Sequence, residues 1–230
     1  MIAALRSTLP AVLLAAGLAA CAGTTRPVET APTPVNAPPV QGGDPTGVSR
    51  ARADSARYPY TTADISFMSG MISHHAQAID MARWAPTHGA SDAVQRLAAR
   101  IINAQRDEIV TMQRWLRDRR LPVPEAKAGP MMMQMGGMSH LMLMPGMLSE
   151  GQMAELDRAR GLEFDRLFLT FMIQHHRGAV SMVGDLFAAD GAGQDETVFK
   201  FASDVNVDQA TEIARMERML ATILFERRAP

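Results

Sequence analysis

Apolar residues recur at helical spacing through most of the chain beyond residue 60. Residues 67–84 read FMSGMISHHAQAIDMARW, and their apolar positions alternate in steps of four and three, as on one face of a helix. One seam along this face holds Phe67, Met71, His74, Ala78 and Met81, and the next holds Met68, Ile72, His75, Ile79 and Ala82. The pattern predicts a helix with a wide buried face and two adjacent histidines near its middle.

The same pattern occurs a second time. Residues 168–186 read FLTFMIQHHRGAVSMVGDL, at a constant offset of 101 from the first copy. The matched positions are Asp64, Phe67, Met71, Ile72, His74, His75, Ala78 and Met81 with Asp165, Phe168, Met172, Ile173, His175, His176, Ala179 and Met182. A second helical stretch follows each copy at an offset of 104, and its matched positions are Ile101, Gln105, Glu108, Ile109 and Met112 with Val205, Gln209, Glu212, Ile213 and Met216. The chain is therefore predicted to contain two copies of one helical hairpin.

These hairpins predict an all-α fold. Each hairpin has one apolar face, and the two faces are buried best when they pack against each other as a four-helix bundle with approximate two-fold symmetry. Strand signals are absent from the sequence, so no sheet is expected. One helix start is predicted at Thr61 or Thr62, with Asp64 in the first turn. Another is predicted at Ser149, which forms a capping-box pattern with Gln152.

The N-terminal residues have a different character. Residues 1–20 contain one positive charge at Arg6, a short apolar stretch and small residues before Cys21, which is typical of a signal peptide. Residues 18–21 read LAAC and resemble a bacterial lipobox, in which the cysteine is acylated. We therefore expect Cys21 to hold the protein on the periplasmic or extracellular face of the bacterial cell envelope. An ordinary secretory signal with a cysteine at this place by chance is the alternative.

The next segment and the overall charge complete the domain prediction. Residues 21–57 are rich in Pro, Thr, Gly and Ala and nearly lack large apolar residues, so they are expected to form a disordered tether. The four-helix bundle domain is expected over residues 58–227, with a methionine-rich crossover at 129–153. The net charge of -1 and the lack of a basic patch disfavour a nucleic-acid partner.

The histidine pairs provide the chemical argument. Four imidazoles are directed into one bundle, and they belong to His74, His75, His175 and His176. The following helices carry Glu108 and Glu212 on their inward faces, where a carboxylate is costly unless it is paired or bound to a metal. One interpretation is a polar network in which each glutamate accepts a hydrogen bond from a histidine and fixes the register. Because the arrangement is doubled, we favour metal binding.

Methionines near the histidines indicate which metal. Met71 and Met172 lie one turn before the histidine pairs, and Met81 and Met182 continue the same seams. Imidazole binds copper, zinc, iron and nickel, whereas thioether favours Cu(I) and, by the same softness, Ag(I). Copper is therefore the predicted ion, and silver is a second candidate. A di-iron site fits less well because it needs about four carboxylates. Haem held by His and Met is chemically allowed, but the chain has no covalent Cys-x-x-Cys-His site.

A methionine-rich segment separates the two hairpins. Its glycines and prolines exclude a long regular helix, so many of its thioethers are expected to be exposed and mobile. The candidate metal ligands in this segment are Met131, Met132, Met133, Met135, Met138, His140, Met142, Met144 and Met147. A flexible set of soft ligands would collect Cu(I) or Ag(I), and an adaptable crossover packed on the bundle is the alternative.

At these residues the sequence resembles the domain of unknown function 305 (DUF305) family, whose hallmark is Phe-x-x-x-Met-Ile-x-His-His-x-x-Ala in each of two halves. Residues 67–78 and 168–179 match this hallmark, and the Met-Pro-Gly-Met run at 144–147 is also typical of the family. The resemblance covers residues 58–227. It implies a ferritin-like four-helix bundle, frequent export from the cytoplasm, and a relation to copper-binding periplasmic proteins linked to copper tolerance.

Together these features predict an envelope-anchored protein that sequesters or transfers copper. Binding is favoured over catalysis because the sequence has no nucleophile-base arrangement and no nucleotide motif. A ferritin-like metal-dependent oxidase is one alternative, and an interaction module whose histidines only form hydrogen bonds is another. A metal-delivery protein or a second copy of the chain is left open as a partner.

Overall fold

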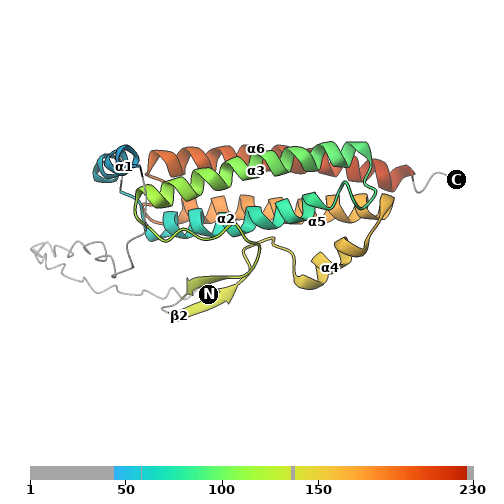
Figure 1. Ribbon diagram of the computed structural model, residues 1–230, viewed down its shortest axis with the longest axis horizontal. Coiled ribbons are helices and arrows are strands. Elements are labelled where there is room, and N and C mark those ends of the chain that lie inside the picture. The colour runs from blue at the N-terminus through green and yellow to red at the C-terminus, as the bar shows by residue number, and fades with distance from the viewer. Residues whose placement is uncertain (1–43, 58, 136–137, 227–230) are drawn as a thin grey trace, which may run out of the picture. The chain divides into compact units, whose positions relative to one another are not determined.

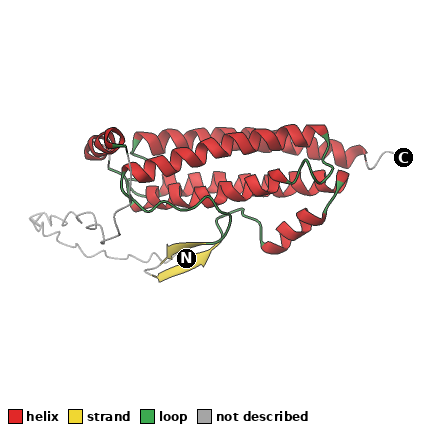
Figure 2. Cartoon of the chain, viewed as in Figure 1, coloured by secondary structure: helices red, strands yellow, loops and turns green. Residues whose placement is uncertain are grey.

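The computed structural model describes residues 44–57, 59–135 and 138–226. The elements within these ranges are α1 (Pro45–Arg57), α2 (Thr62–Arg83), α3 (Asp92–Asp118), β1 (Met131–Met135), β2 (Met138–Met142), α4 (Glu150–Arg158), α5 (Gly161–Ala188) and α6 (Glu196–Glu226). Figure 2 shows that helices dominate this part of the chain. None of the helices described here is both long and apolar enough to cross a membrane.

The four long helices form a four-helix bundle from two hairpins. α2 packs on α3 and α5 packs on α6, as the sequence repeat predicts. α2 also packs on α5, so the two histidine-bearing helices form one layer, and α3 with α6 forms the other (Figure 1). The start of α2 lies beside the end of α5, because residues from both ends line one pocket. The predicted all-α bundle of two repeated hairpins is confirmed.

Reciprocal hydrogen bonds define two of the helix starts. The Thr61 hydroxyl accepts a hydrogen bond from the Asp64 amide at 3.3 Å, and the Asp64 carboxylate accepts one from the Thr61 amide at 2.6 Å. Ser149 and Gln152 form the same kind of pair at the start of α4. These capping boxes satisfy backbone N–H groups that a first helical turn leaves free. Both predicted starts are confirmed, the first at Thr61.

The repeated aspartates connect the two hairpins at opposite ends of the bundle. The Asp64 carboxylate accepts a hydrogen bond from the Gly193 amide, at 2.7 Å, in the loop between α5 and α6. The Asp165 carboxylate accepts two from the Ser91 amide, at 3.1 and 3.2 Å, where α3 begins. Each carboxylate is buried and bonds to the loop of the other hairpin. The aspartates are therefore structural and lie away from the histidines in the middle of the helices.

Two apolar clusters fill the bundle. The first combines side chains from the N-terminal half of α2 and the C-terminal half of α5 with others from the C-terminal half of α3 and the N-terminal half of α6. The second combines side chains from the opposite halves of the same two helices with others from the N-terminal half of α3 and from the crossover and α4. In both helices the histidine pair lies where one cluster gives way to the other. The histidines therefore form a polar layer between two apolar blocks.

The methionine-rich segment contains a β-hairpin, so the expectation that the chain has no strands is wrong. β1 and β2 pair antiparallel, with Met131 opposite Met142 and Met133 opposite His140. Backbone hydrogen bonds hold a two-stranded ladder together whatever the side chains are. Because neither strand contains a β-branched residue, the composition gave no strand signal. The signal that was available is the Gly-Gly pair at 136–137 between two short apolar runs.

Helix α1 replaces part of the predicted tether. Residues 21–57 are expected to lack regular structure, but Pro45–Arg57 form a helix that packs on α3. The Asp44 carboxylate accepts a hydrogen bond from the Thr46 amide at 3.3 Å, and Ala51 is buried. A short helix can pack on another helix through small residues such as Ala51. Because α1 therefore needs few large apolar side chains, its composition resembles that of a disordered segment. The predicted signal peptide, Cys21 and the tether up to residue 43 lie outside the described residues.

Replacing Asp64 with alanine should lower the free energy of unfolding by about 3 kcal/mol, because the change removes a capping box and a buried charge-assisted hydrogen bond. Urea unfolding followed by circular dichroism measures this loss. Asp80→Ala is the matched control, because the Asp80 side chain is 44% exposed and pairs with Arg83 on the surface. The control should cost less than about 1 kcal/mol. Equal losses in the two variants would contradict the connecting role of Asp64.

Candidate metal centre

Four buried imidazoles meet at the middle of α2 and α5. We call His74 and His175 the inner pair, because their ring centroids are only 3.8 Å apart. His75 and His176 form the outer pair, and their ring centroids lie 6.3 and 6.2 Å from those of the neighbouring inner rings. Successive residues on a helix are about 100° apart, which separates each inner ring from its outer neighbour. All four side chains are fully buried, and together they form the histidine centre.

The inner rings use the Nε2 atom to bond to backbone carbonyl groups. The Nε2 of His74 donates to the carbonyl oxygen of Pro145 at 3.0 Å. The Nε2 of His175 donates to the carbonyl oxygen of His74, also at 3.0 Å. A carbonyl oxygen only accepts, so the proton of each neutral ring lies on Nε2. The lone pair of each inner ring therefore lies on Nδ1.

The outer rings contact the two inward-facing glutamates. The Nε2 of His176 lies 2.8 Å from the Glu212 carboxylate and forms a hydrogen bond with it. The Nε2 of His75 lies 2.6 Å from the Glu108 carboxylate, without the alignment of a hydrogen bond. The glutamate side chains are 20% and 22% exposed, so each links a fully buried imidazole to the surface of the bundle. The predicted pairing of one glutamate with one histidine in each hairpin is present.

The other nitrogen of each ring has no partner. Among the described residues, the Nδ1 atoms of all four histidines are buried without a hydrogen bond. His88 behaves differently, although it is also buried. Its Nδ1 lies 2.9 Å from the Thr87 hydroxyl, and its Nε2 lies 2.9 Å from the Asp157 carbonyl oxygen. A histidine with a structural role in this fold therefore satisfies both nitrogens, whereas every ring of the histidine centre leaves its buried Nδ1 atom unpaired.

Burial keeps the inner rings neutral. It lowers the pKa of His74 to about 3, and the neighbouring His75 lowers it further, against the effect of the Pro145 hydrogen bond. Burial also lowers the pKa of His175 well below its usual value, with a second contribution from His74. A neutral imidazole carries the lone pair that a metal ion requires. Both inner rings are therefore in the ligand form at pH 7.

The chain between the two hairpins passes directly over the histidine centre. Gln77 exchanges two hydrogen bonds with the backbone of Leu148, at 3.0 and 2.7 Å. The Ser73 hydroxyl lies within hydrogen-bond distance of the carbonyl oxygens of Lys127 and Gly129, earlier in the same connection. Gly178 allows the close approach, because a Cβ atom there would lie 2.0 Å from the Pro145 carbonyl oxygen. Sequence reasoning did not identify Pro145 as a partner of His74. Only the Met-Pro-Gly-Met run marked this place.

The predicted methionine ligands divide between the two apolar clusters. Met71 and Met182 belong to the first cluster, and Met81 and Met172 belong to the second, so thioethers lie on both sides of the polar layer. All four are buried.

The crossover methionines differ from one another in exposure. Met132 is 61% exposed and Met142 is 42% exposed, as expected for a loop that collects ions. Met144 and Met147 are only 4% and 6% exposed, because they pack in the first apolar cluster. The expected exposure is therefore wrong for these two residues. The side chains of Met133, Met135, Met138 and His140 lie outside the described part of the structure, and Met131 is partly buried.

An acidic groove runs between α3 and α6, next to the outer glutamates. Its volume is about 450 Å³, and Glu108, Asp204 and Asp208 are among the residues that line it. Burial raises the pKa of Asp208, and the negative charges of Glu108, Asp204 and Glu212 raise it further. Sequence reasoning missed this groove, because its carboxylates come from two helices and form no local pattern.

The predicted ligands do not converge on a single point. Within the ranges that the structure describes, no three side chains of His, Cys, Asp or Glu are placed to hold one metal ion together. The arrangement instead offers the inner imidazole pair, two imidazole–carboxylate pairs and buried thioethers on both sides. Such pairs suit ions of low coordination number better than ions that need four or more oxygen ligands.

Lowering the pH should destabilise the fold through the inner pair. Below about pH 6.5 the unfolded chain binds a proton at His74, whereas the folded chain binds none there until about pH 3. Stability is therefore lost as the pH falls through this window, by about 2 kcal/mol for His74 alone between pH 6.5 and 5. Urea unfolding at pH 7 and pH 5 measures the loss, and His74→Gln should reduce it. An unchanged pH dependence in that variant would show that His74 is not the group responsible.

Solved structures of related proteins share this fold. A DUF305 protein of Streptomyces coelicolor, described as secreted, is 29% identical with a TM-score of 0.60, and the match covers 70% of this chain and 93% of that one. A DUF305 fragment from Deinococcus radiodurans is 29% identical with a TM-score of 0.58, covering 71% and 98%. CopM in its Cu(II)-bound form is 30% identical with a TM-score of 0.53, covering 69% and 96%. CopM also has Cu(I)-bound and silver-bound forms, with TM-scores of 0.52 and 0.51.

No curated protein matches the sequence. The family described as domain of unknown function (DUF305) matches residues 64–220, which include all four bundle helices except the ends of α2 and α6. This match covers more than half of the chain and agrees with the solved structures. The protein therefore belongs to the DUF305 family.

Proposed function

We propose that the protein binds copper, as Cu(I) or Cu(II), or silver, through the Nδ1 atoms of the histidine centre. The observation that carries this proposal is that all four bundle histidines leave a buried Nδ1 unpaired, whereas the buried His88 does not. Leaving one buried polar group without a hydrogen bond costs about 1–3 kcal/mol. A metal ion would use these lone pairs and remove that cost.

The donor set favours a soft ion. Two neutral inner imidazoles face each other, and the thioethers of Met71, Met172, Met81 and Met182 lie above and below them. Imidazole and thioether together suit Cu(I) and Ag(I), while the imidazole–carboxylate pairs of His75 with Glu108 and His176 with Glu212 suit Cu(II). The relative CopM, which has been solved in Cu(I), Cu(II) and silver forms, supports this choice of ions. An iron site is less suitable, because among the described residues only the carboxylates of Glu108 and Glu212 contact the histidine centre.

The role we propose is sequestration or transfer of metal at the bacterial cell envelope. Acylation of Cys21 would hold the protein at a membrane, with the bundle on the periplasmic or extracellular side. The exposed thioethers of Met132 and Met142 would collect ions before they reach the histidine centre. A metal-delivery protein would then exchange ions with the bundle. The description of a relative as secreted agrees with a location outside the cytoplasm.

The double variant His74→Gln with His175→Gln should lower the affinity of the histidine centre for Cu(I) by about 100-fold or more, because it removes both inner imidazoles. Glutamine keeps an N–H donor for each carbonyl partner, so the fold should survive. Anaerobic titration against a competing Cu(I) chelator measures the affinity and the number of bound ions. The exposed thioethers of the β-hairpin, Met132 and Met142, should still bind Cu(I) in this variant.

His88→Gln is the matched control for the double variant. It removes a buried histidine whose two nitrogens already have partners, so it should lower stability and leave Cu(I) binding unchanged. Unaltered Cu(I) binding in the variant that lacks both inner histidines would overturn the proposed centre.

If metals also left the thermal stability of the natural chain unchanged, the histidines would act only as a hydrogen-bonded network. Turnover with dioxygen or peroxide in the copper- or iron-loaded protein would favour the oxidase alternative.

Replacing Glu108 and Glu212 together with glutamine should lower metal affinity by about 10- to 100-fold, because a carboxylate that bonds to a ligand histidine orients the ring and raises its basicity. The amide keeps an oxygen acceptor near each outer ring but loses the charge. Glu217→Gln is the control, since Glu217 is 47% exposed and pairs with Arg177 on the surface. The same chelator competition measures both variants, and a loss of equal size in the control would refute the role of the outer glutamates.

A further inference from the structure

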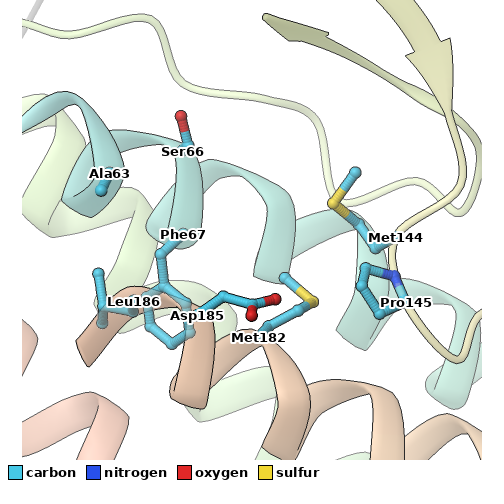
Figure 3. A pocket seen from close by; sticks show the side chains of 8 residues that line it. All are labelled: Ala63, Ser66, Phe67, Met144, Pro145, Met182, Asp185 and Leu186. Atoms are coloured by element: carbon cyan, nitrogen blue, oxygen red, sulfur yellow. The ribbon is translucent and has the colours of Figure 1, made fainter. Parts of the chain in front are cut away.

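A pocket of about 210 Å³ opens between the start of α2 and the end of α5, beside the crossover (Figure 3). Two thioethers line it, one from Met182 on α5 and one from Met144 on the crossover. Their side chains are 8% and 4% exposed, so most of each lies inside the protein. Sequence reasoning placed these methionines in two separate groups of candidate ligands. The structure brings them to one pocket.

The two thioethers come together because Gly70 has no side chain. A Cβ atom at Gly70 would lie 2.9 Å from the Sδ atom of Met144 and 3.6 Å from the Cε atom of Met182. Both side chains therefore approach one point on the surface of α2. Thioether sulfur is a soft ligand, and two thioethers within reach of one point suit a soft monovalent cation.

The residues that open this pocket differ from their matches in the other half of the internal repeat. Small or polar residues open it, and bulky apolar residues occupy the positions that match them at the offset of 101. The opening positions are Ala63, Ser66, Gly70 and Asp185, and their counterparts are Phe164, Leu167, Phe171 and Trp84. These counterparts pack in the second apolar cluster. Met182 is matched by Met81 in the other half. The thioether is therefore repeated, but the residues at the neighbouring matched positions are bulkier.

The pocket is both accessible and adjacent to the histidine centre. Pro145 lines the pocket, and its carbonyl oxygen accepts the hydrogen bond from the Nε2 atom of His74 at 3.0 Å. Asp185 also lines the pocket, one helical turn after Met182, and its side chain is exposed. A carboxylate at this place attracts a cation and offsets its charge. The pocket therefore joins the solvent to the backbone that covers the inner pair.

We infer that this pocket is a second soft-metal site, at which the thioethers of Met144 and Met182 bind Cu(I) or Ag(I). The inference rests on the proposed function, because it assigns a further site for the same class of ion. It differs from the histidine centre in its donors, which are two sulfur atoms and no imidazole, and it shares only Met182 with the thioethers that flank that centre. An apolar pocket with two sulfur atoms and one carboxylate also disfavours hard ions such as Mg²⁺ and Ca²⁺, which need several oxygen ligands.

The test is an NMR titration of the full chain, labelled with carbon-13 in the methionine methyl groups, with silver nitrate. Silver is soft and stays monovalent, so no redox chemistry complicates the result. Single Met144→Leu and Met182→Leu variants assign the two signals, and leucine preserves most of the packed volume. Both signals should shift together as one equivalent of silver binds. The signal of Met112, which is buried in the same apolar cluster but does not line the pocket, should stay in place.

The double variant Met144→Leu with Met182→Leu should bind one silver ion fewer than the natural chain, while Met112→Leu should bind the same number. Methyl signals of Met144 and Met182 that stay in place when silver binds elsewhere would overturn the inference, and this result needs no folded double variant. The variant lacking both inner histidines separates the two proposals. If the pocket signals still shift there while total binding is unchanged, the histidine centre fails and the pocket stands. If binding falls there but the pocket signals never shift, the pocket fails and the centre stands.

Discussion

The burial of four imidazoles between two apolar clusters is the constraint on which the rest of the structure depends. Full burial removes the water that would otherwise bond to the ring nitrogens, so each ring must find partners inside the protein or remain unsatisfied. The inner rings bond to the carbonyl groups of Pro145 and His74, and the outer rings turn to Glu108 and Glu212. These contacts use Nε2 in every ring. They determine which nitrogen is left for a ligand, and the low dielectric of the same burial keeps the inner rings neutral.

The crossover makes the two halves of the repeat chemically different. It approaches α5 closely at Gly178, whereas the matching position on α2 is Gln77, which binds the crossover through its side chain. By symmetry His74 would bond to the carbonyl of His175, but it bonds to Pro145 instead. The crossover also brings Met144 onto Gly70, where the other half has Phe171. The crossover thus gives the two ends of a nearly symmetric bundle different side-chain surroundings.

Oxygen and sulfur atoms lie next to the histidine centre in different layers of the bundle. The carboxylates of the acidic groove lie between α3 and α6 and adjoin the outer rings through Glu108. The thioethers of Met144 and Met182 lie at the α2–α5 layer and adjoin the inner rings through Pro145. Oxygen and sulfur donors differ in the ions that they prefer. The bundle therefore keeps its oxygen atoms in one layer and these sulfur atoms in the other.

The sequence by itself determined the helices, the repeat and the positions of the histidines and glutamates, because helical periodicity at Phe67, Met71 and His74 is local information. It did not reveal α1, which has few large apolar residues, or the β-hairpin, whose strands contain no β-branched residue. Only the tertiary structure decided that Asp64 and Asp165 connect the hairpins, that Nδ1 is the unpaired nitrogen, and that Met144 and Met182 line one pocket. Each of these depends on contacts between segments far apart in the chain, which the local pattern of a helix does not encode.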